Sequence, residues 1–226
     1  MKRGNKSRII DDKVYLYSKV PTSKNLLIQE AVYSGLQAAR VNLRTSKKVK
    51  IRIWVLARIK GGMPSRAATN KKFISIGITR KYLNSRNIYK NLAGTVIHEY
   101  IHFLRLHSGR HRAKTILDAV IEEGIAIYIQ SAVAKPPNYL DIKTLDEKMI
   151  KICWDKFSEV IDKPIKKRYW NKIENNEIYR AIYYRLGFGI VRRFMELNPG
   201  ISLAKLVRIS EKKLARFAHI YRKGLK

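Results

Sequence analysis

Residues 88–107 read IYKNLAGTVIHEYIHFLRLH, a mostly apolar run that holds two histidines four residues apart. Its length and composition predict a buried helix. On a helix, His98 and His102 lie on one face one turn apart, so both imidazoles can reach one metal ion. Glu99 is rotated by about 100° from His98. Its carboxylate is then beside the open coordination position, where it can accept a proton from a bound water.

Chance is a poor explanation of this spacing. The chain has only five His and ten Glu residues, so random placement would give the pattern with an expectation of roughly 0.005. The alternative is a pair of core histidines. That arrangement would leave two imidazoles and a carboxylate in an apolar helix without partners, which costs free energy.

A catalytic zinc site needs a third protein ligand. The candidates are His107, His111, Glu122 and Glu123. The metzincin spacing requires a glycine and a histidine where this chain has Arg105 and Ser108, which excludes that arrangement. His111 follows Gly109 in a predicted loop and stays possible. A carboxylate from a second helix, predicted over residues 113–134, is geometrically more natural because two adjacent helices can face one ion.

The sequence on both sides of the histidines resembles the gluzincin pattern. About twenty residues after HEYIH, residues 121–128 read IEEGIAIY, similar to the Glu-Gly-x-Ala-x-Tyr segment that supplies the third ligand in that clan. The match resembles a family of predicted Zn-dependent proteases, strongly over residues 88–134 and more weakly over residues 177–215. The resemblance implies a zincin-like fold and one Zn²⁺ ion. It also implies a peptidase in which Glu99 assists the attack of a zinc-bound water on a peptide bond.

The resemblance also implies roles for single residues. With His98 and His102, the third ligand is the glutamate directly before Gly124, which is Glu123. Adjacent helical residues point about 100° apart, so Glu122 is expected to be solvated or to contact a ligand instead. Asp118 is expected either to orient a ligand histidine or to be exposed.

A tyrosine in the C-terminal half is the predicted transition-state donor. Tyr184, three residues before Gly187, resembles the tyrosine that hydrogen-bonds the oxyanion in aminopeptidase-like gluzincins. A packed tyrosine is an equally open interpretation, with Tyr183 and Arg185 as alternative donors. The chain lacks a segment like the Gly-x-Met-Glu-Asn of aminopeptidases, which favours an endopeptidase.

The remaining pattern predicts an α+β fold. A helix is expected over residues 22–42 and strands over residues 49–58 and 73–79, and only helices follow. A small N-terminal sheet is therefore expected to pack on the active-site helix, with a helical C-terminal half. Phe73–Thr79 is predicted to be the edge strand that pairs with a peptide substrate, an ordinary edge strand being the alternative.

The later helices and the domain boundary follow from turn and capping residues. Thr144 and Glu147 predict a capping box for a helix to about residue 160, another helix is expected over residues 176–197, and Ser202 and Ser210 each precede a short basic helix. The proline-containing segment 135–143 divides the chain into subdomains 1–134 and 135–226 of a single catalytic domain.

Composition limits the class of partner. The net charge is +31, from 48 basic and 17 acidic residues, so the surface attracts polyanions such as nucleic acid. Four alternatives follow: a uniformly solvated basic surface, a nucleic-acid-associated protein with a vestigial or structural zinc site, a protease acting on nucleic-acid-bound proteins, and a basic surface that selects acidic peptides. The single cysteine, Cys153, excludes an internal disulfide and is expected to be buried. Residues 1–20 have no apolar signal region and no long apolar run occurs, so the expected location is the cytoplasm. The oligomeric state stays open.

Overall fold

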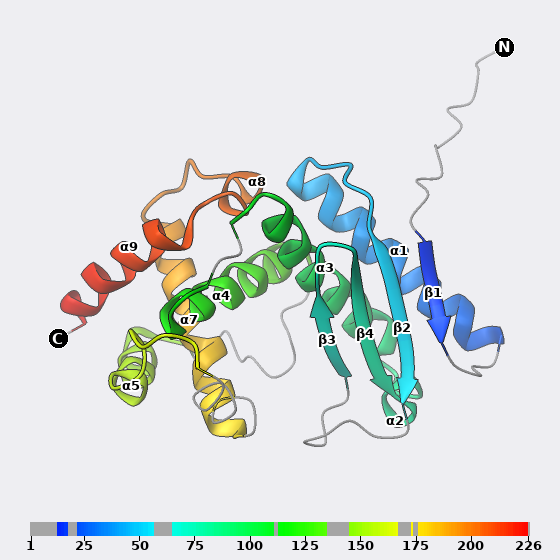
Figure 1. Cartoon of the computed structure of the whole chain (residues 1–226), viewed down its shortest axis with the longest axis horizontal. Coiled ribbons are helices and arrows are strands. Elements are labelled where there is room, and N and C mark those ends of the chain that lie inside the picture. The colour runs from blue at the N-terminus through cyan, green and yellow to red at the C-terminus, as the bar shows by residue number, and fades with distance from the viewer. Residues whose placement is uncertain are drawn as a thin grey trace, which may run out of the picture.

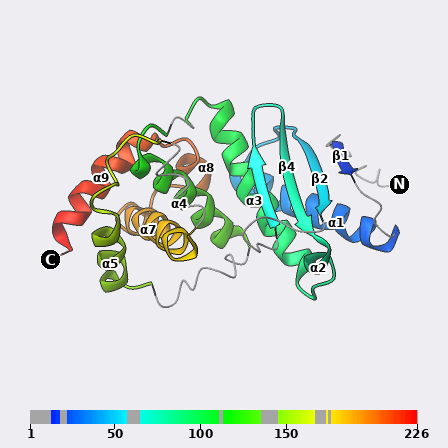
Figure 2. The same ribbon diagram turned by 60° about the horizontal axis from the view of Figure 1, so that its bottom comes forward.

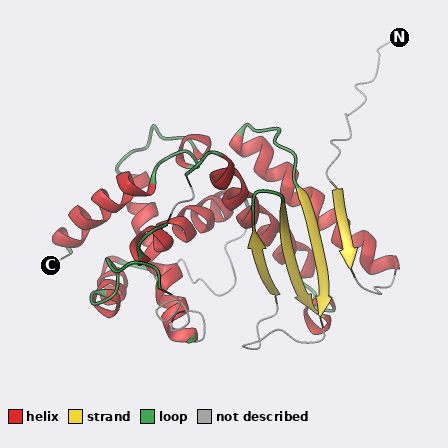
Figure 3. Cartoon of the chain, in the orientation of Figure 1, coloured by secondary structure: helices red, strands yellow, loops and turns green. Residues whose placement is uncertain are grey.

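The computed structural model describes residues 13–17, 22–56, 65–110, 113–134, 145–166, 173 and 176–225. These residues form one small mixed sheet and a larger set of helices (Figure 3), which confirms the α+β prediction. The predicted boundary segment 135–143, the predicted turn at residues 61–64 and His111 lie outside the described residues. The two-subdomain division therefore stays a prediction.

The sheet has the strand order β1-β2-β4-β3, from β1 (Lys13–Tyr17), β2 (Lys50–Leu56), β4 (Phe73–Thr79) and β3 (Ser65–Thr69). The first three strands are parallel and β3 is antiparallel to β4. The helix α1 (Thr22–Leu43) connects β1 to β2, as a parallel pair requires. The prediction that Phe73–Thr79 is an edge strand is wrong, because β3 pairs along its outer side.

One face of the sheet builds the core. Ile51 and Ile53 of β2 and the three isoleucines of β4 are fully buried, because side chains alternate between the two faces of a strand. In Figures 1 and 2, α1 and the helix α3 (Ile88–His107) lie on one side of the strands. The sheet therefore packs on the helix that contains both histidines, as predicted.

The C-terminal half is helical, with α4 (Ile116–Val133), α5 (Glu147–Phe157), α7 (Glu177–Glu196), α8 (Leu203–Leu206) and α9 (Glu211–Gly224), while the short α2 (Arg80–Leu83) follows the sheet. Ser202 and Ser210 cap α8 and α9, as predicted. The cap of α5 is Asp146, so Glu147 is the first helical residue and the capping box predicted from it is wrong. This helix also ends three residues before the predicted limit, at Phe157.

The helices α4 and α7 cross in backbone contact at two glycines. A Cβ on Gly187 would overlap the carbonyl oxygen of Val120, and a Cβ on Gly124 would overlap that of Gly187. Both positions therefore exclude any larger side chain. Glu123 directly precedes Gly124, so the close crossing fixes the position of α7 relative to Glu123.

Substitution of Gly187 by alanine is expected to lower the free energy of unfolding by about 1–3 kcal/mol, because two backbones must separate to admit one methyl group. Urea unfolding followed by circular dichroism measures the change. Gly200→Ala is the matched control, since a Cβ there has no neighbour within 4 Å. Equal stability of the two variants would contradict the close crossing.

Candidate metal centre

The two histidines and one glutamate converge between α3 and α4. His98 and His102 approach each other with their Nε2 atoms 3.1 Å apart. Glu123 lies 3.0 Å from His98 Nε2 and 3.4 Å from His102 Nε2 through its two carboxylate oxygens. One ligand atom from each of the three residues lies within 4.8 Å of the others. The arrangement brings together the three residues that the sequence and the resemblance selected.

These separations suit a zinc ion. Two donors at about 2.0–2.1 Å from one ion and at a tetrahedral angle lie about 3.3 Å apart, close to the distances between these imidazole and carboxylate atoms. Two facing imidazole nitrogens and a carboxylate have only lone pairs to direct at one another unless a proton or a cation lies between them. The donor set of two nitrogens and one oxygen is that of known catalytic zinc sites.

Electrostatics favour positive charge at the same point. Burial disfavours the imidazolium form of His102, but Glu123 and Glu122 outweigh it, so its pKa lies well above the ordinary value. Burial also opposes ionisation of Glu123, but His102 and His98 outweigh it and lower its pKa far below the ordinary value. The carboxylate is thus ionised and attracts a proton or a metal cation.

Glu99 is positioned by a residue that the sequence did not reveal. The Thr69 hydroxyl, at the end of β3, donates a 2.5 Å hydrogen bond to Glu99 Oε2. The glutamate is 8% exposed, so this bond fixes one carboxylate oxygen and leaves the other available. No local pattern marks Thr69, since the contact joins residues that are thirty positions apart.

A cavity of about 460 Å³ opens beside His102 and Glu123, two of the three candidate ligands. Its lining includes Thr69, Glu99, His102, Glu123 and the buried Tyr183. The predicted oxyanion donor, Tyr184, is half-buried and is not among the lining residues. Its ring centroid lies 5.4 Å from that of Tyr183. Among the described residues that line the cavity, the one tyrosine is therefore Tyr183, which the sequence offered as an alternative donor to Tyr184.

Glu122 is buried rather than solvated. Arg105 donates to both of its oxygens, from Nε at 2.9 Å and from Nη2 at 2.7 Å. One of these oxygens lies 3.8 Å from Nδ1 of His102, on the side of the ring away from Glu123. Of its two expected positions, solvated or in contact with a ligand, Glu122 therefore takes the second, beside the candidate ligand His102.

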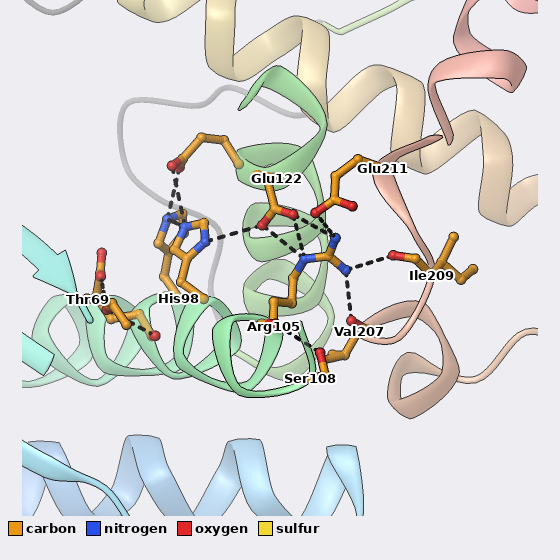
Figure 4. A network of polar contacts seen from close by, with 11 residues as sticks. Thr69, His98, Arg105, Ser108, Glu122, Val207, Ile209 and Glu211 are labelled. Atoms are coloured by element: carbon orange, nitrogen blue, oxygen red, sulfur yellow. Dashed lines mark hydrogen bonds and ion pairs between the residues drawn. The ribbon is translucent and has the colours of Figure 1, made fainter. Parts of the chain in front are cut away.

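Arg105 connects the site to the C-terminal helices (Figure 4). It is fully buried, and its Nη1 donates to the carbonyl oxygens of Val207 and Ile209. Its Nη2 also donates to Glu211 at 3.1 Å, at the start of α9. The sequence signal for this network was available: an arginine within an apolar helix requires an acceptor.

The other candidates are placed elsewhere. Asp118 accepts hydrogen bonds from the backbone N–H groups of Lys114 and Thr115, so it caps α4 and neither of its two expected roles applies. His107 is exposed and pairs through Nδ1 with the carbonyl oxygen of Phe103. It does not belong to the three-ligand group. Cys153 is buried, as predicted, and burial raises its pKa to about 11.

Glu211 adds a pH dependence to stability. Burial and then Glu122 raise its pKa to about 7, from an ordinary value of 4.5. The folded chain therefore holds a proton that the unfolded chain releases, so this contribution to stability is complete below pH 4.5 and disappears as the pH rises through 7. The glutamine in Glu211→Gln cannot ionise. The melting temperature of this variant should therefore fall less between pH 5 and pH 8 than that of the wild type. Glu159→Gln, at an exposed position, is the control, and identical pH profiles for all three proteins would refute the assignment.

Sequence comparisons agree with the geometry. Residues 46–216 match a protein family described as predicted Zn-dependent protease (DUF2268). A search of curated proteins and a search of solved structures gave no match.

Proposed function

Because the chain belongs to a family of predicted Zn-dependent proteases, we propose that it is a zinc metallopeptidase of the gluzincin type with a zincin-like fold. The observation that carries the proposal is the convergence of His98, His102 and Glu123 beside a cavity that Glu99 also lines. A site with only a structural role is usually closed by four protein ligands and needs no such glutamate. The proposed substrate is a peptide or protein, cut internally.

His98, His102 and Glu123 would hold one Zn²⁺ ion. When bound, the ion supplies Lewis acidity, which polarises a peptide carbonyl and makes a water molecule more acidic. The chain supplies the proton transfers. The free oxygen of Glu99 accepts the proton of the attacking water and then donates it to the leaving amine, while Thr69 holds the other oxygen.

We assign the oxyanion donor to Tyr183 in preference to Tyr184, because Tyr183 lines the cavity. A phenol hydroxyl directed at the developing negative oxygen stabilises the transition state. The outer strand β3 provides two small residues, Ala67 and Ala68, to the cavity wall. An extended peptide can approach the backbone of β3 there, so this strand replaces Phe73–Thr79 as the proposed peptide-binding edge.

Purified protein tests the proposal directly. We expect one zinc per chain by atomic emission and cleavage of a proteome-derived peptide library, with internal cleavage sites. His98→Ala and His102→Ala should each lose zinc and cleavage together. Full cleavage by protein that contains no stoichiometric zinc would overturn the proposal. Among the described residues, no helix is long and apolar enough to cross a membrane.

Removal of the Thr69 hydroxyl should slow the reaction. In Thr69→Val, Glu99 loses a charge-assisted hydrogen bond of about 1.5–3 kcal/mol, so kcat should fall about ten- to a hundredfold with little change in KM. Thr69→Ser keeps the hydroxyl and should restore most of kcat. Equal loss in both variants would show that the shape of the threonine matters and not its hydroxyl.

A further inference from the structure

The face of the sheet that points away from α1 and α3 has an unusual composition. The register of β1, β2 and β4 aligns the residues of this face in three rows across the strands. The first row is Lys13, Lys50 and Phe73, the second is Tyr15, Arg52 and Ser75, and the third contains Trp54 and Gly77. The strands in Figure 1 lie in front of the helices, and of the described elements none covers this face. Aromatic rings and cations therefore alternate over an open sheet.

Two of the aromatic side chains are well exposed. Tyr15 and Trp54 are each 38% exposed, although aromatic residues on sheets are commonly covered. They belong to neighbouring strands one pleat apart, so their Cα atoms lie about 8 Å from each other. The small residues Ser75 and Gly77 on the next strand leave room beside them. The exposed parts of these two rings lie near each other on the same face of the sheet, where planar groups can contact them.

Cations surround the rings. The Arg52 guanidinium carbon lies over the Phe73 ring, 3.9 Å from its centroid, so this cation is held against the sheet. Lys13 and Lys50 are exposed at the end where the parallel strands begin, and Lys72 directly precedes β4 at the same end. Asp11 and Asp12 directly precede Lys13, but Glu30 is the only acidic residue between Lys13 and His98 in the sequence, so basic residues far outnumber acidic ones in this part of the chain.

We propose that this face of the sheet binds single-stranded nucleic acid. Unpaired bases stack on exposed aromatic rings of open sheets, while Lys and Arg contact the phosphates. A duplex presents no free base faces to Tyr15 and Trp54. An anionic membrane would be attracted by the charge, but it gives no reason for flat rings beside Ser75 and Gly77. The surface lies on the opposite side of the sheet from α3, so the inference does not depend on the proposed peptidase activity.

The test is binding of the full chain to fluorescein-labelled oligo(dT) and oligo(U), followed by anisotropy over a salt series. Tryptophan emission should also be quenched on binding, because a base stacks on Trp54. Trp54→Thr, which keeps strand propensity, should weaken binding about fivefold or more. Tyr15→Ala should act similarly, and Tyr33→Ala, an exposed tyrosine on α1, is its matched control.

The charge contribution has its own readout. Arg52→Gln should reduce the slope of log K against log salt by about 0.7, the value for one lost phosphate contact on a single strand. Trp54→Thr should weaken binding without changing this slope. Arg208→Gln is the control, at an exposed position beyond α8. Comparison of oligo(U) with oligo(dU), which differ only in the 2′-hydroxyl, shows whether that group contributes.

Three outcomes would overturn the proposal. One is no binding to either oligonucleotide at low salt. Another is undiminished binding by both Trp54→Thr and Tyr15→Ala, which would mean that only diffuse charge attracts the strand. The third is tighter binding to duplex DNA or to phosphatidylserine vesicles than to the single strands. Failure of this test would leave zinc content and peptide cleavage unaffected.

Discussion

Glu99→Gln should reduce peptide cleavage by about 10²–10⁴-fold while the protein keeps its zinc. The amide has the size of the carboxylate but cannot accept a proton from the attacking water. The three ligands are unchanged, so metal content should stay at the wild-type level. Thr69 can still donate to the amide oxygen in the place of Oε2, so the side chain should keep its position.

The measurement combines kcat on a peptide identified from the library with zinc analysis of the same sample. Glu30→Gln, an exposed glutamate on α1, controls for the loss of one negative charge. If Glu99→Gln cleaved at the wild-type rate, the activity would come from another group or from a contaminating protease. If it lost zinc instead, Glu99 would have to be counted among the residues that maintain the metal site.

Arg105→Leu should lower the free energy of unfolding by about 3–5 kcal/mol. Arg105 is fully buried and pairs with Glu122 and Glu211, and its removal would leave the buried Glu122 carboxylate without its guanidinium partner. It also donates to the carbonyl oxygens of Val207 and Ile209, which would lose a partner in the interior. Urea unfolding followed by circular dichroism gives the change from the shift in midpoint.

The double variant Arg105→Leu with Glu122→Leu separates two explanations. If the cost arises from an isolated buried charge, removal of both partners should restore part of the stability, because an apolar pair of similar volume is tolerated. If the single and double variants are equally unstable, the loss arises from the unpaired carbonyl oxygens of Val207 and Ile209, between α8 and α9. A single variant within about 1 kcal/mol of the wild type would contradict a structural role for the network.

The sequence by itself identified the residues that form the candidate metal site. The four-residue spacing of His98 and His102 needs only helical geometry to bring the two rings to one ion, and the resemblance selected Glu123 on the next helix. The helices 88–107 and 176–197 were predictable for the same reason, since periodicity and capping are local properties. The fold class followed from the order of strands and helices.

Only the tertiary structure decided which residues support that site. Thr69 reaches Glu99 because β3, and not Phe73–Thr79, forms the outer edge of the sheet, and strand order depends on pairing between distant segments. Tyr183 lines the cavity because Gly124 and Gly187 let α4 and α7 touch, which sets the rotation of α7. Local patterns fix which side chains share a helix face, while long-range packing fixes what that face meets, and the second cannot be read from spacing in one chain.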